Sequence, residues 1–159
     1  MALEIEHKFL LASDDWRREI DHSLHFKQGY LTSSPLSSIR VRISGDSAWL
    51  NIKSATIGNQ RLEFEYAIPF SDANAILDEL CCRPLVEKIR HFVPREPFVW
   101  EIDEFLGDNA GLIVAEIELP DIGAAFEKPV WLGKEITYDT RYYNNNLSLH
   151  PFKNWGQNN

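Results

Sequence analysis

The stretch LEIEHKFLL (3–11) alternates charged and apolar side chains almost from the start of the chain. Side chains two residues apart on a strand point to the same side, so Glu4, Glu6 and Lys8 share one face. The opposite face carries Leu3, Ile5, His7 and Phe9. Because neighbouring like charges on one strand face repel each other, this pattern requires surroundings that compensate for the repulsion.

The same spacing of charged residues recurs in IRVRI (39–43), LEFEY (62–66), VEKIRHF (86–92), WEIDEF (100–105) and VAEIEL (114–119), and WLNIK (49–53) places the polar Asn51 and the charged Lys53 in the same relation. One interpretation is that these are the solvated outer faces of an ordinary antiparallel sheet. Solvated faces usually mix Thr, Ser and Lys, however, and Glu is a poor strand former. Repeated doublets of a single sign therefore indicate that the strands share one charged environment.

Turn signals and apolar periodicity divide the chain into strands and a few helices. The pattern predicts strands over 2–10, 26–32, 38–44, 47–54, 61–68, 85–93, 97–106 and 112–119. Tight hairpins are expected at SGDS (44–47) and GDNAG (107–111). Helices are expected over 13–24, 71–82 and 120–132, with helical turns in 140–149 and a frayed tail of about ten residues after them. The fold class is therefore α+β, built on an antiparallel sheet.

Closing the eight predicted strands into a barrel explains the doublets. An eight-stranded barrel leaves an interior wide enough for side chains or one small ligand. With the charged faces turned inward, the lumen holds clustered cations and carboxylates, and the amphipathic helices flank the apolar outer faces. Unpaired buried charges cost several kcal/mol each, so such a lumen should hold water, divalent metal and a highly charged ligand.

Length, composition and charge narrow the class of protein. The 159 residues, with 44% hydrophobic and 12% aromatic residues, predict a single soluble globular domain over 1–159. No apolar run approaches the roughly 18–20 residues of a membrane span, and no signal peptide is recognisable. A net charge of −8 argues against binding to duplex nucleic acid or to an anionic membrane. The adjacent Cys81 and Cys82 suit a reducing compartment, so we expect a cytoplasmic protein.

The types of charged residue indicate phosphoryl transfer. Carboxylates without a set of His or Cys ligands suit hard cations such as Mg²⁺ or Mn²⁺. Arginine forks match phosphate oxygens, so both charge types together suit a metal–polyphosphate complex. Transfer of a phosphoryl group to water requires clamped phosphates, neutralised charge and a positioned water molecule.

The same residues resemble the CYTH superfamily, also called the triphosphate tunnel metalloenzymes. EIEHK (4–8) matches its N-terminal ExExK mark, which alone would be a weak signal. The likeness continues through KQGYL (27–31), IRVR (39–42), LNIK (50–53), LEFEY (62–66), EKIRH (87–91), WEIDEF (100–105), NAGLIVAEIEL (109–119), WLGKEIT (131–137) and RYYNNNL (141–147). The resemblance covers nearly the whole chain and implies an eight-stranded antiparallel tunnel that acts on triphosphates with Mg²⁺ or Mn²⁺, two ions in the active complex.

Carried over position by position, the resemblance implies roles for individual residues. It implies metal binding by Glu4, Glu6, Glu63, Glu65, Asp103, Glu116 and Glu118. It implies substrate binding by Lys8, Arg40, Arg42, Lys53, Lys88 and Arg90. The expected catalytic residues are Lys8, Lys53, Glu116 and Glu118. Lys8 should lie near the reacting phosphoryl group, and Glu116 or Glu118 should activate the attacking water.

Several functions share these tunnel residues. The leading hypothesis is hydrolysis of inorganic tripolyphosphate to pyrophosphate and phosphate, as in similar short bacterial members. Thiamine triphosphatase, nucleoside or RNA 5′-triphosphatase, and class IV adenylate cyclase remain alternatives. A non-catalytic binder of polyphosphate or nucleotide is a further alternative, and a purely structural barrel would leave the doublets unexplained. The expected partner is a small-molecule triphosphate, with a homodimer possible because the outer faces are apolar.

Overall fold

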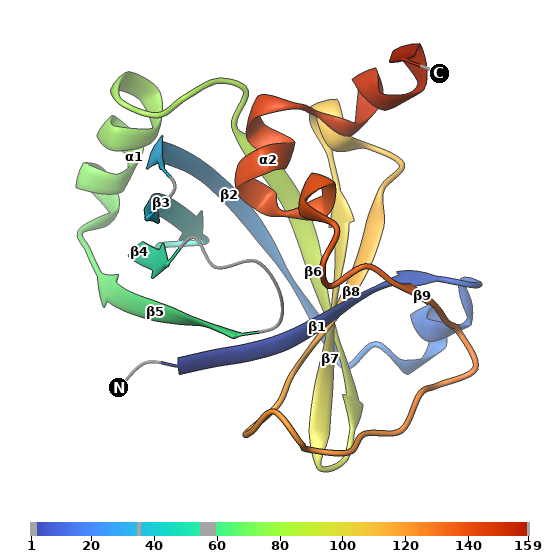
Figure 1. Ribbon diagram of the computed structural model, residues 1–159. Coiled ribbons are helices and arrows are strands. Elements are labelled where there is room, and N and C mark those ends of the chain that lie inside the picture. The colour runs from blue at the N-terminus through green and yellow to red at the C-terminus, as the bar shows by residue number, and fades with distance from the viewer. Residues whose placement is uncertain (1–2, 35, 55–59, 159) are drawn as a thin grey trace.

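The computed structural model describes residues 3–34, 36–54 and 60–158 (Figure 1). Within these ranges the strands are β1 (Leu3–Leu11), β2 (His22–Ser33), β3 (Ser37–Ser44), β4 (Ser47–Ser54), β5 (Gln60–Ala67), β6 (Val86–Arg95), β7 (Phe98–Phe105), β8 (Ile113–Glu118) and β9 (Leu132–Glu135). The α-helices are α1 (Phe70–Glu79) and α2 (Asn144–Leu149). Short 3-10 helices span Asp15–Glu19, Gly107–Asn109, Thr140–Tyr142 and Phe152–Asn158.

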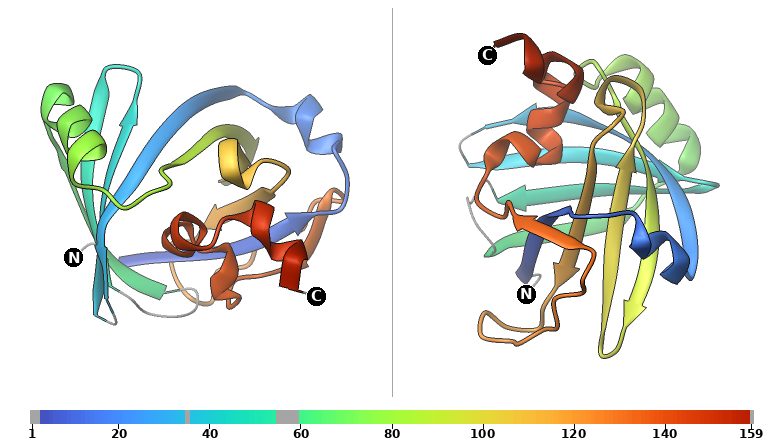
Figure 2. Two further views of the ribbon diagram at one scale, coloured as in Figure 1. Left: turned by 90° about the horizontal axis from the view of Figure 1, so that it is seen from above. Right: turned by 90° about the vertical axis from the view of Figure 1, so that its right-hand side faces the viewer.

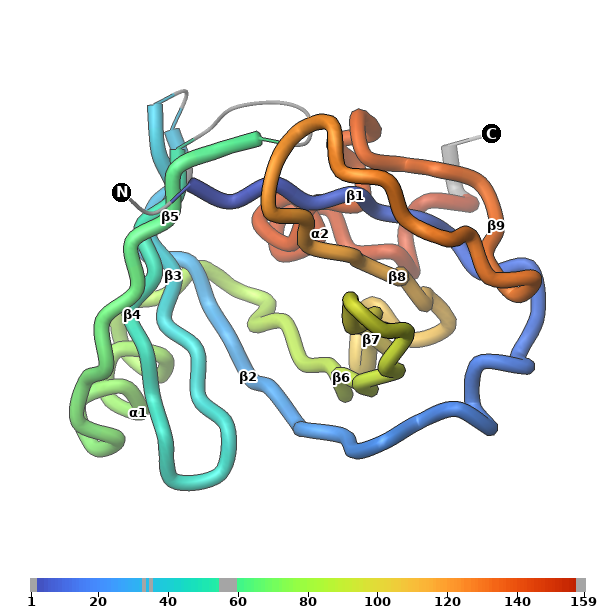
Figure 3. The backbone as a smooth tube through the Cα atoms, turned by 90° about the horizontal axis from the view of Figure 1, so that it is seen from below, coloured from blue at the N-terminus to red at the C-terminus, as the bar shows by residue number. Residues whose placement is uncertain are grey.

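Eight of these strands close into an antiparallel barrel, which confirms the predicted fold class. Hydrogen-bonded neighbours follow the order β5-β4-β3-β2-β6-β7-β8-β1, and β5 pairs back onto β1. In that closing pair Leu3 lies opposite Leu62 and Ile5 lies opposite Gln60. Figure 3 shows the strands following one another around a ring. A closed barrel has no free strand edges along its wall.

The extra strand β9 joins β1 beyond the end of β5. Leu11 lies opposite Leu132, and the register shifts between this pair and the pairing of Phe9 with Glu135. β5 and β9 therefore share one edge of β1, since β8 occupies the other edge. Both pairings hold β1 in place, which fixes the three charged side chains of its inner face.

Strand alternation places the apolar faces outside, and other segments cover much of this surface, although Phe64 and Tyr66 on β5 stay exposed. The largest core cluster lies on the outer face of β1, β6, β7 and β8, and includes Phe9, Trp16, Trp100, Ile117 and Trp131. Trp16 comes from the 3-10 helix Asp15–Glu19, and Trp131 comes from the segment before β9. A smaller cluster joins α1 to the outer face of β3 and β4, with Val41, Ala48, Ala73 and Leu77. Burial of these side chains stabilises the barrel from outside.

Toward one end of the barrel the inner face itself becomes apolar. Val86, Phe105 and Val114 have the same alternation as the charged residues of β6, β7 and β8, and they join a buried cluster with Leu147 of α2. In the view from above in Figure 2, α2 lies within the outline of the ring of strands. The α2 end of the lumen is thus packed with apolar side chains.

Three predicted helical or frayed segments are wrong. Residues 13–24 form only the 3-10 helix Asp15–Glu19, because β2 begins at His22 and pairs with β6 from there. Residues 120–132 form no helix, since they contain Pro120, Gly123 and Pro129, and β9 starts at Leu132. The tail forms the 3-10 helix Phe152–Asn158, whose Phe152 and Trp155 pack on the cluster at the α2 end.

The other predicted elements agree with the structure to within a few residues. The helix expected over 71–82 is α1, and the turns expected in 140–149 are the 3-10 helix Thr140–Tyr142 and α2. The hairpin at 44–47 turns at Gly45, whose φ of 58° favours glycine. Residue 2 of the first predicted strand and residue 159 of the tail lie outside the described residues, and the interpretation of 1–159 as one domain stays a prediction.

No helix in the described ranges is long and apolar enough to cross a lipid bilayer.

Candidate active site

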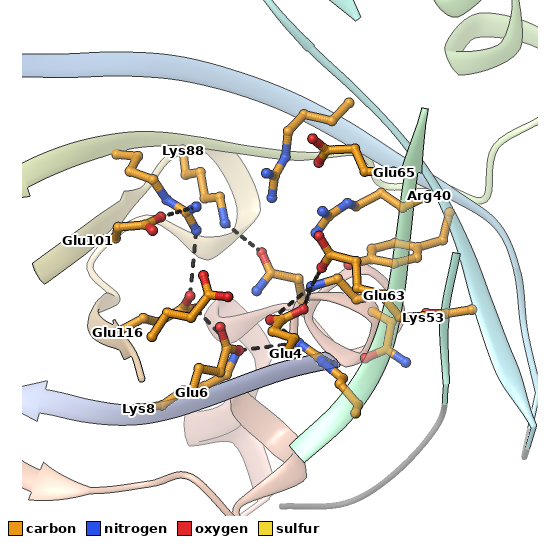
Figure 4. Close-up of a pocket in the computed structure, with 18 of the residues that line it drawn as sticks. Glu4, Glu6, Lys8, Arg40, Lys53, Glu63, Glu65, Lys88, Glu101 and Glu116 are labelled. Carbon is orange, nitrogen blue, oxygen red and sulfur yellow. Dashed lines mark hydrogen bonds and ion pairs between the residues drawn. The ribbon is translucent and has the colours of Figure 1, made fainter. Parts of the chain in front are cut away.

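The barrel encloses a cavity of about 360 Å³ whose walls are almost entirely charged or polar. Figure 4 shows these side chains converging from strands on all sides of the lumen. The lining residues include the cations Lys8, Arg40, Arg42, Lys53, Arg61, Lys88 and Arg90. The lining carboxylates are Glu4, Glu6, Glu63, Glu65, Glu101, Glu116 and Glu118. Strand alternation accounts for this composition, because each charged doublet has turned inward.

One wall of the cavity, formed by β1, β7 and β8, concentrates negative charge. Glu6 lies directly opposite Glu118, and Glu101 lies directly opposite Glu116, in the strand pairings. Burial and the charge of Glu116 raise the pKa of Glu6 to about 7. Burial, together with Glu4 and Glu6, raises the pKa of Glu118 to about 7. We call Glu4, Glu6, Glu101, Glu116 and Glu118 the acidic wall.

Lys8 lies within the acidic wall as a partial counter-ion. Its Nζ lies 3.2 Å from Glu116 Oε1 and 3.5 Å from Glu6 Oε1. Burial alone would lower the pKa of Lys8, but the carboxylates of Glu116 and Glu6 outweigh it and raise the pKa above its ordinary value. Lys8 therefore stays cationic over the physiological pH range, next to the most crowded carboxylates of the lumen.

Two further cations hold the N-terminal carboxylates of β1. Lys53 Nζ lies 3.2 Å from Glu4 Oε2 and 2.8 Å from Glu63 Oε2, the residue opposite it on β5. Arg61 Nη2 donates to Glu6 Oε1 at 3.2 Å and lies 3.6 Å from Glu4 Oε1. Glu4 and Glu6 thus each contact cations that come from other strands of the barrel.

The wall formed by β3 concentrates positive charge. Arg40 is buried, and its Nε atom has no hydrogen-bond partner among the described residues. Arg42 donates through Nε to Gln28 Oε1 at 2.9 Å and lies 4.6 Å from the centre of the Phe26 ring. Burial, with the charges of Arg40 and Arg90, lowers the pKa of Arg42 to about 9. We call Arg40 and Arg42 the arginine wall, since neither guanidinium group forms an ion pair with a carboxylate among the residues that the structure describes.

Lys88, Arg90 and Asp103 form an ion-pair group deeper in the lumen. Lys88 Nζ donates to Asp103 Oδ2 at 2.7 Å, and Arg90 donates to both oxygens of Asp103 at 2.7 and 2.9 Å. Arg90 also forms an ion pair with Glu101. Burial lowers the pKa of Lys88 to about 7, although Asp103 opposes that shift. Despite burial, the charges of Arg90 and Lys88 keep the pKa of Asp103 below its ordinary value.

Asn144, the first residue of α2, connects this group to the helix. Its side-chain oxygen accepts hydrogen bonds from Gln28 Nε2 at 2.9 Å and from Lys88 Nζ at 3.0 Å. The neighbouring Tyr143 donates from its hydroxyl group to the Thr137 carbonyl at 2.8 Å, and Lys8 Nζ lies 5.3 Å from the centre of its ring. The start of α2 therefore contacts residues at both sides of the lumen.

The structure brings nearly all of the residues singled out from the sequence into one cavity. Glu4, Glu6, Lys8, Arg40, Arg42, Lys53, Glu63, Glu65, Lys88, Arg90, Glu116 and Glu118 all line it. Asp103, expected to bind metal, is fully buried and is not among the lining residues. Both of its oxygens accept hydrogen bonds from Lys88 or Arg90, so its carboxylate is already satisfied by the chain. The individual catalytic, substrate and metal roles stay predictions.

Some lining residues were not assigned from the sequence. Arg61 lies two residues before Glu63 and has the same alternation, so extending the LEFEY doublet backward would have found it. Glu101 belongs to the doublet in WEIDEF (100–105), but no catalytic, substrate-binding or metal-binding role was predicted for it. Tyr30 and Asn144 carry no charge pattern, although they belong to KQGYL (27–31) and RYYNNNL (141–147), two of the segments that resemble the family. Only the path of β2 and α2 through space brings them there.

The residues that fall on the opposite alternation lie outside the lumen. His7 Nδ1 lies 2.8 Å from Glu135 Oε2, on the side of β1 that faces β9. His91 lies 2.6 Å from Ser23 Oγ and 3.0 Å from Glu104 Oε1, packed near the Trp16 ring. Neither histidine lines the cavity, so the lumen offers oxygen donors rather than imidazole.

The donor atoms of the acidic wall fit a hard divalent cation such as Mg²⁺ or Mn²⁺. They are carboxylate oxygens, the ligands these ions prefer. Burial, together with neighbouring carboxylates, raises the pKa of Glu6 and of Glu118, and a bound cation would favour the ionised form of both. Among the described residues, however, no three His, Cys, Asp or Glu side chains already stand in the arrangement of a metal site. Lys8, Lys53 and Arg61 contact those carboxylates instead.

Comparison with known proteins gives concordant matches. The CYTH domain family matches residues 2–148. The chain is 46% identical over 155 residues to an inorganic triphosphatase of Acetivibrio thermocellus, covering 98% of this chain and 99% of that protein. A crystal structure of an inorganic triphosphatase is 31% identical, with a TM-score of 0.65, and the match covers 94% of this chain and 96% of that one.

A more distant match shares the fold. A candidate adenylyl cyclase from Hippeastrum, whose dominant activity is given as triphosphatase, is 15% identical with a TM-score of 0.62. That match covers 74% of this chain and 80% of that one.

Proposed function

Since this chain belongs to the CYTH domain family, we propose that it hydrolyses inorganic triphosphate to pyrophosphate and phosphate inside its barrel, with Mg²⁺ or Mn²⁺ as the cofactor. The identity of 46% to an inorganic triphosphatase over 98% of the chain supports the choice of substrate. The observation that carries the proposal is that one cavity separates an acidic wall from an arginine wall. In a metal–triphosphate complex, the positive metal ions would face the acidic wall and the negative phosphate oxygens would face the arginine wall.

The arginine wall would bind the phosphate chain. Arg40 and Arg42 lie on β3 two residues apart, so their guanidinium groups can meet neighbouring phosphoryl groups. The buried Nε of Arg40 donates to no acceptor in the described part of the chain, and a phosphate oxygen would accept its hydrogen bond. Lys53, Lys88 and Arg90 would bind the remaining phosphate oxygens from the other sides of the lumen. An anion would also favour the charged form of Arg42, whose pKa is lowered in the free protein.

The acidic wall would hold two divalent cations through Glu4, Glu6, Glu116 and Glu118, with Glu63 and Glu65 contributing directly or through water, whereas Asp103 is held by Lys88 and Arg90. When bound, these ions neutralise charge that develops on the phosphoryl oxygens and help to orient the attacking water. Lys8, held between Glu6 and Glu116, would place a fixed positive charge beside the reacting phosphoryl group. Lys53 would stabilise the same charge from across the lumen.

A proton must leave the attacking water, and the two candidate acceptors differ in the structure. Glu116 contacts Lys8 and Arg90, and these cations hold its pKa well below the ordinary value although burial opposes them. Glu118 forms no ion pair within the described residues, and its pKa is near 7. Glu118 is therefore the carboxylate that the described side chains leave available to the attacking water, which favours it over Glu116 as the proton acceptor.

A substrate panel tests the proposal. The purified protein is incubated with Mg²⁺ or Mn²⁺ and tripolyphosphate, ATP, thiamine triphosphate or pyrophosphate, and the products are quantified. We expect tripolyphosphate to give equal amounts of pyrophosphate and phosphate, and chelator to abolish the reaction. Preferential use of ATP with cyclic AMP as product would replace the proposal with a cyclase. Tight triphosphate binding without turnover would indicate a binding module.

A further inference from the structure

We propose that Arg61 is a resident counter-ion of the metal-binding carboxylates, which leaves Glu4 and Glu6 when a divalent cation binds and then contacts the triphosphate. This inference rests on the proposed function, because it assumes that Glu4 and Glu6 bind metal. In this role Arg61 opposes metal binding in the free protein and binds the triphosphate directly in the loaded one.

The position of Arg61 is the first observation. Its guanidinium bridges Glu6 Oε1 at 3.2 Å and Glu4 Oε1 at 3.6 Å, the two carboxylates of the inner face of β1. Arg61 also lies opposite Glu4 in the pairing of β5 with β1. The guanidinium therefore occupies the space between the two side chains where a shared cation would have to bind.

The electrostatics of Arg61 is the second observation. Its side chain is largely withdrawn from water, with 20% of it exposed. Its ion pairs with Glu4 and Glu6 therefore lie in surroundings of low dielectric, where opposite charges attract each other more strongly than in water. The same pairs make Arg61 a strong competitor for the carboxylates, since a divalent cation must displace it or share them with a nearby positive charge.

Lys53 provides the contrast that singles out Arg61. Lys53 also contacts Glu4, but it retains a 2.8 Å ion pair with Glu63 on the facing strand. The ion pairs that Arg61 forms with described residues are those with Glu4 and Glu6 alone. Neutralisation of these two carboxylates by a cation would leave Arg61 without an anionic partner, in a cavity that it lines. A triphosphate in that cavity supplies a new partner.

This exchange predicts coupling between the two ligands. Without triphosphate, metal binding must separate Arg61 from its carboxylates, which weakens the apparent affinity for metal. With triphosphate present, the released guanidinium binds phosphate, and this contact offsets part of the free energy lost when Arg61 leaves Glu4 and Glu6. Metal and triphosphate should then strengthen each other's binding, and the coupling must be reciprocal.

The experiment measures Mn²⁺ affinity by titration calorimetry, using chelator-treated full-length protein with and without a non-hydrolysable imidotriphosphate. Arg61→Gln removes the positive charge, and Arg61→Lys retains it. Arg18→Gln is the matched control, because Arg18 is exposed and the substitution changes the net charge equally. In the absence of imidotriphosphate, we expect Arg61→Gln to bind Mn²⁺ about tenfold or more tightly than the wild type, within the usual range of coupling between two sites.

The same titrations contain the outcomes that would overturn the inference. Arg61→Lys and Arg18→Gln should bind Mn²⁺ within about threefold of the wild type, and imidotriphosphate should tighten Mn²⁺ binding less in Arg61→Gln than in the wild type. Unchanged or weaker Mn²⁺ binding by Arg61→Gln would overturn the counter-ion role alone. No Mn²⁺ binding by any of the proteins would overturn the metal site of the proposed function as well.

Discussion

Glu6 and Glu118 lie directly opposite each other in the antiparallel pairing of β1 and β8, so two carboxylates face each other across neighbouring strands. Like charges in this position normally destabilise a sheet. Both carboxyl groups have a pKa near 7, which means that they resist ionisation in the free protein. The barrel retains an unfavourable pair at the position where the proposed function requires negative charge, an arrangement typical of functional sites.

Substitution of Glu118 by Gln should separate activity from stability. Glu118→Gln removes the candidate proton acceptor, so we expect the kcat for tripolyphosphate to fall by about a hundredfold or more. It also removes the repulsion with Glu6, so the metal-free variant should have a higher Tm than the wild type at pH 8. Phosphate release and thermal unfolding measure the two effects. A variant with near-normal kcat would show that Glu118 takes no part in catalysis.

The stability of the metal-free protein should fall as the pH rises. The folded-state pKa values of Glu6 and Glu118 are raised from 4.5 to about 7, so in this window the folded protein binds more protons than the unfolded chain. Stability therefore decreases between about pH 4.5 and pH 7 through these two groups. Thermal unfolding across this range should show a smaller decrease for Glu118→Gln. An unchanged slope in Glu118→Gln would contradict the assignment.

Removal of Arg42 should weaken both binding and turnover. Arg42→Ala takes one of the two guanidinium groups from the arginine wall, and we expect kcat/KM to fall by about a hundredfold or more. Arg42→Lys keeps a charge but loses the forked geometry, so it should restore only part of the loss. Steady-state kinetics with tripolyphosphate provide the comparison. If exposed Arg18→Ala reduced kcat/KM as much as Arg42→Ala, a general effect of charge would explain the result instead.

Asp103 should prove essential for the stability of the barrel. Asp103→Asn leaves Lys88 and Arg90 buried without their shared carboxylate, and breaking such a group typically costs about 3–5 kcal/mol of unfolding free energy. Urea unfolding of metal-free protein measures that cost. Asp108, which forms an exposed pair with Lys153, provides the matched control Asp108→Asn, expected to be near neutral. If Asp103→Asn and Asp108→Asn lowered the unfolding free energy equally and only slightly, Asp103 would again be a candidate metal ligand.

The strands and the polarity of their faces were predictable because strand alternation is a local property. The doublets of Glu63 and Glu65, or of Arg40 and Arg42, point to the lumen as expected. The helical errors arose where tertiary packing overrides local periodicity. Trp16, at helical spacing from Ile20, is buried on the outer face of the barrel, while the chain after it already extends to pair with β6.

Ion-pair partners, by contrast, depend on distances across the barrel that a sequence does not contain. Asp103 has the alternation of a lumen residue, but the register of β6 and β7 places it opposite Arg90 and removes it from the cavity surface. Arg61 was detectable by alternation, yet its contacts with Glu4 and Glu6 follow only from closure of β5 onto β1. The α2 contacts of Asn144 likewise require the three-dimensional path of the C-terminal segment.

The most direct test of the central claim is a crystal structure of Glu118→Gln with tripolyphosphate and Mn²⁺, with the ions located by anomalous diffraction. The proposed function predicts Mn²⁺ beside Glu4, Glu6 and Glu116, and triphosphate oxygens within hydrogen-bond distance of Arg40 and Arg42. Triphosphate bound outside the barrel, or a lumen that holds neither ligand at saturating concentrations, would contradict the account.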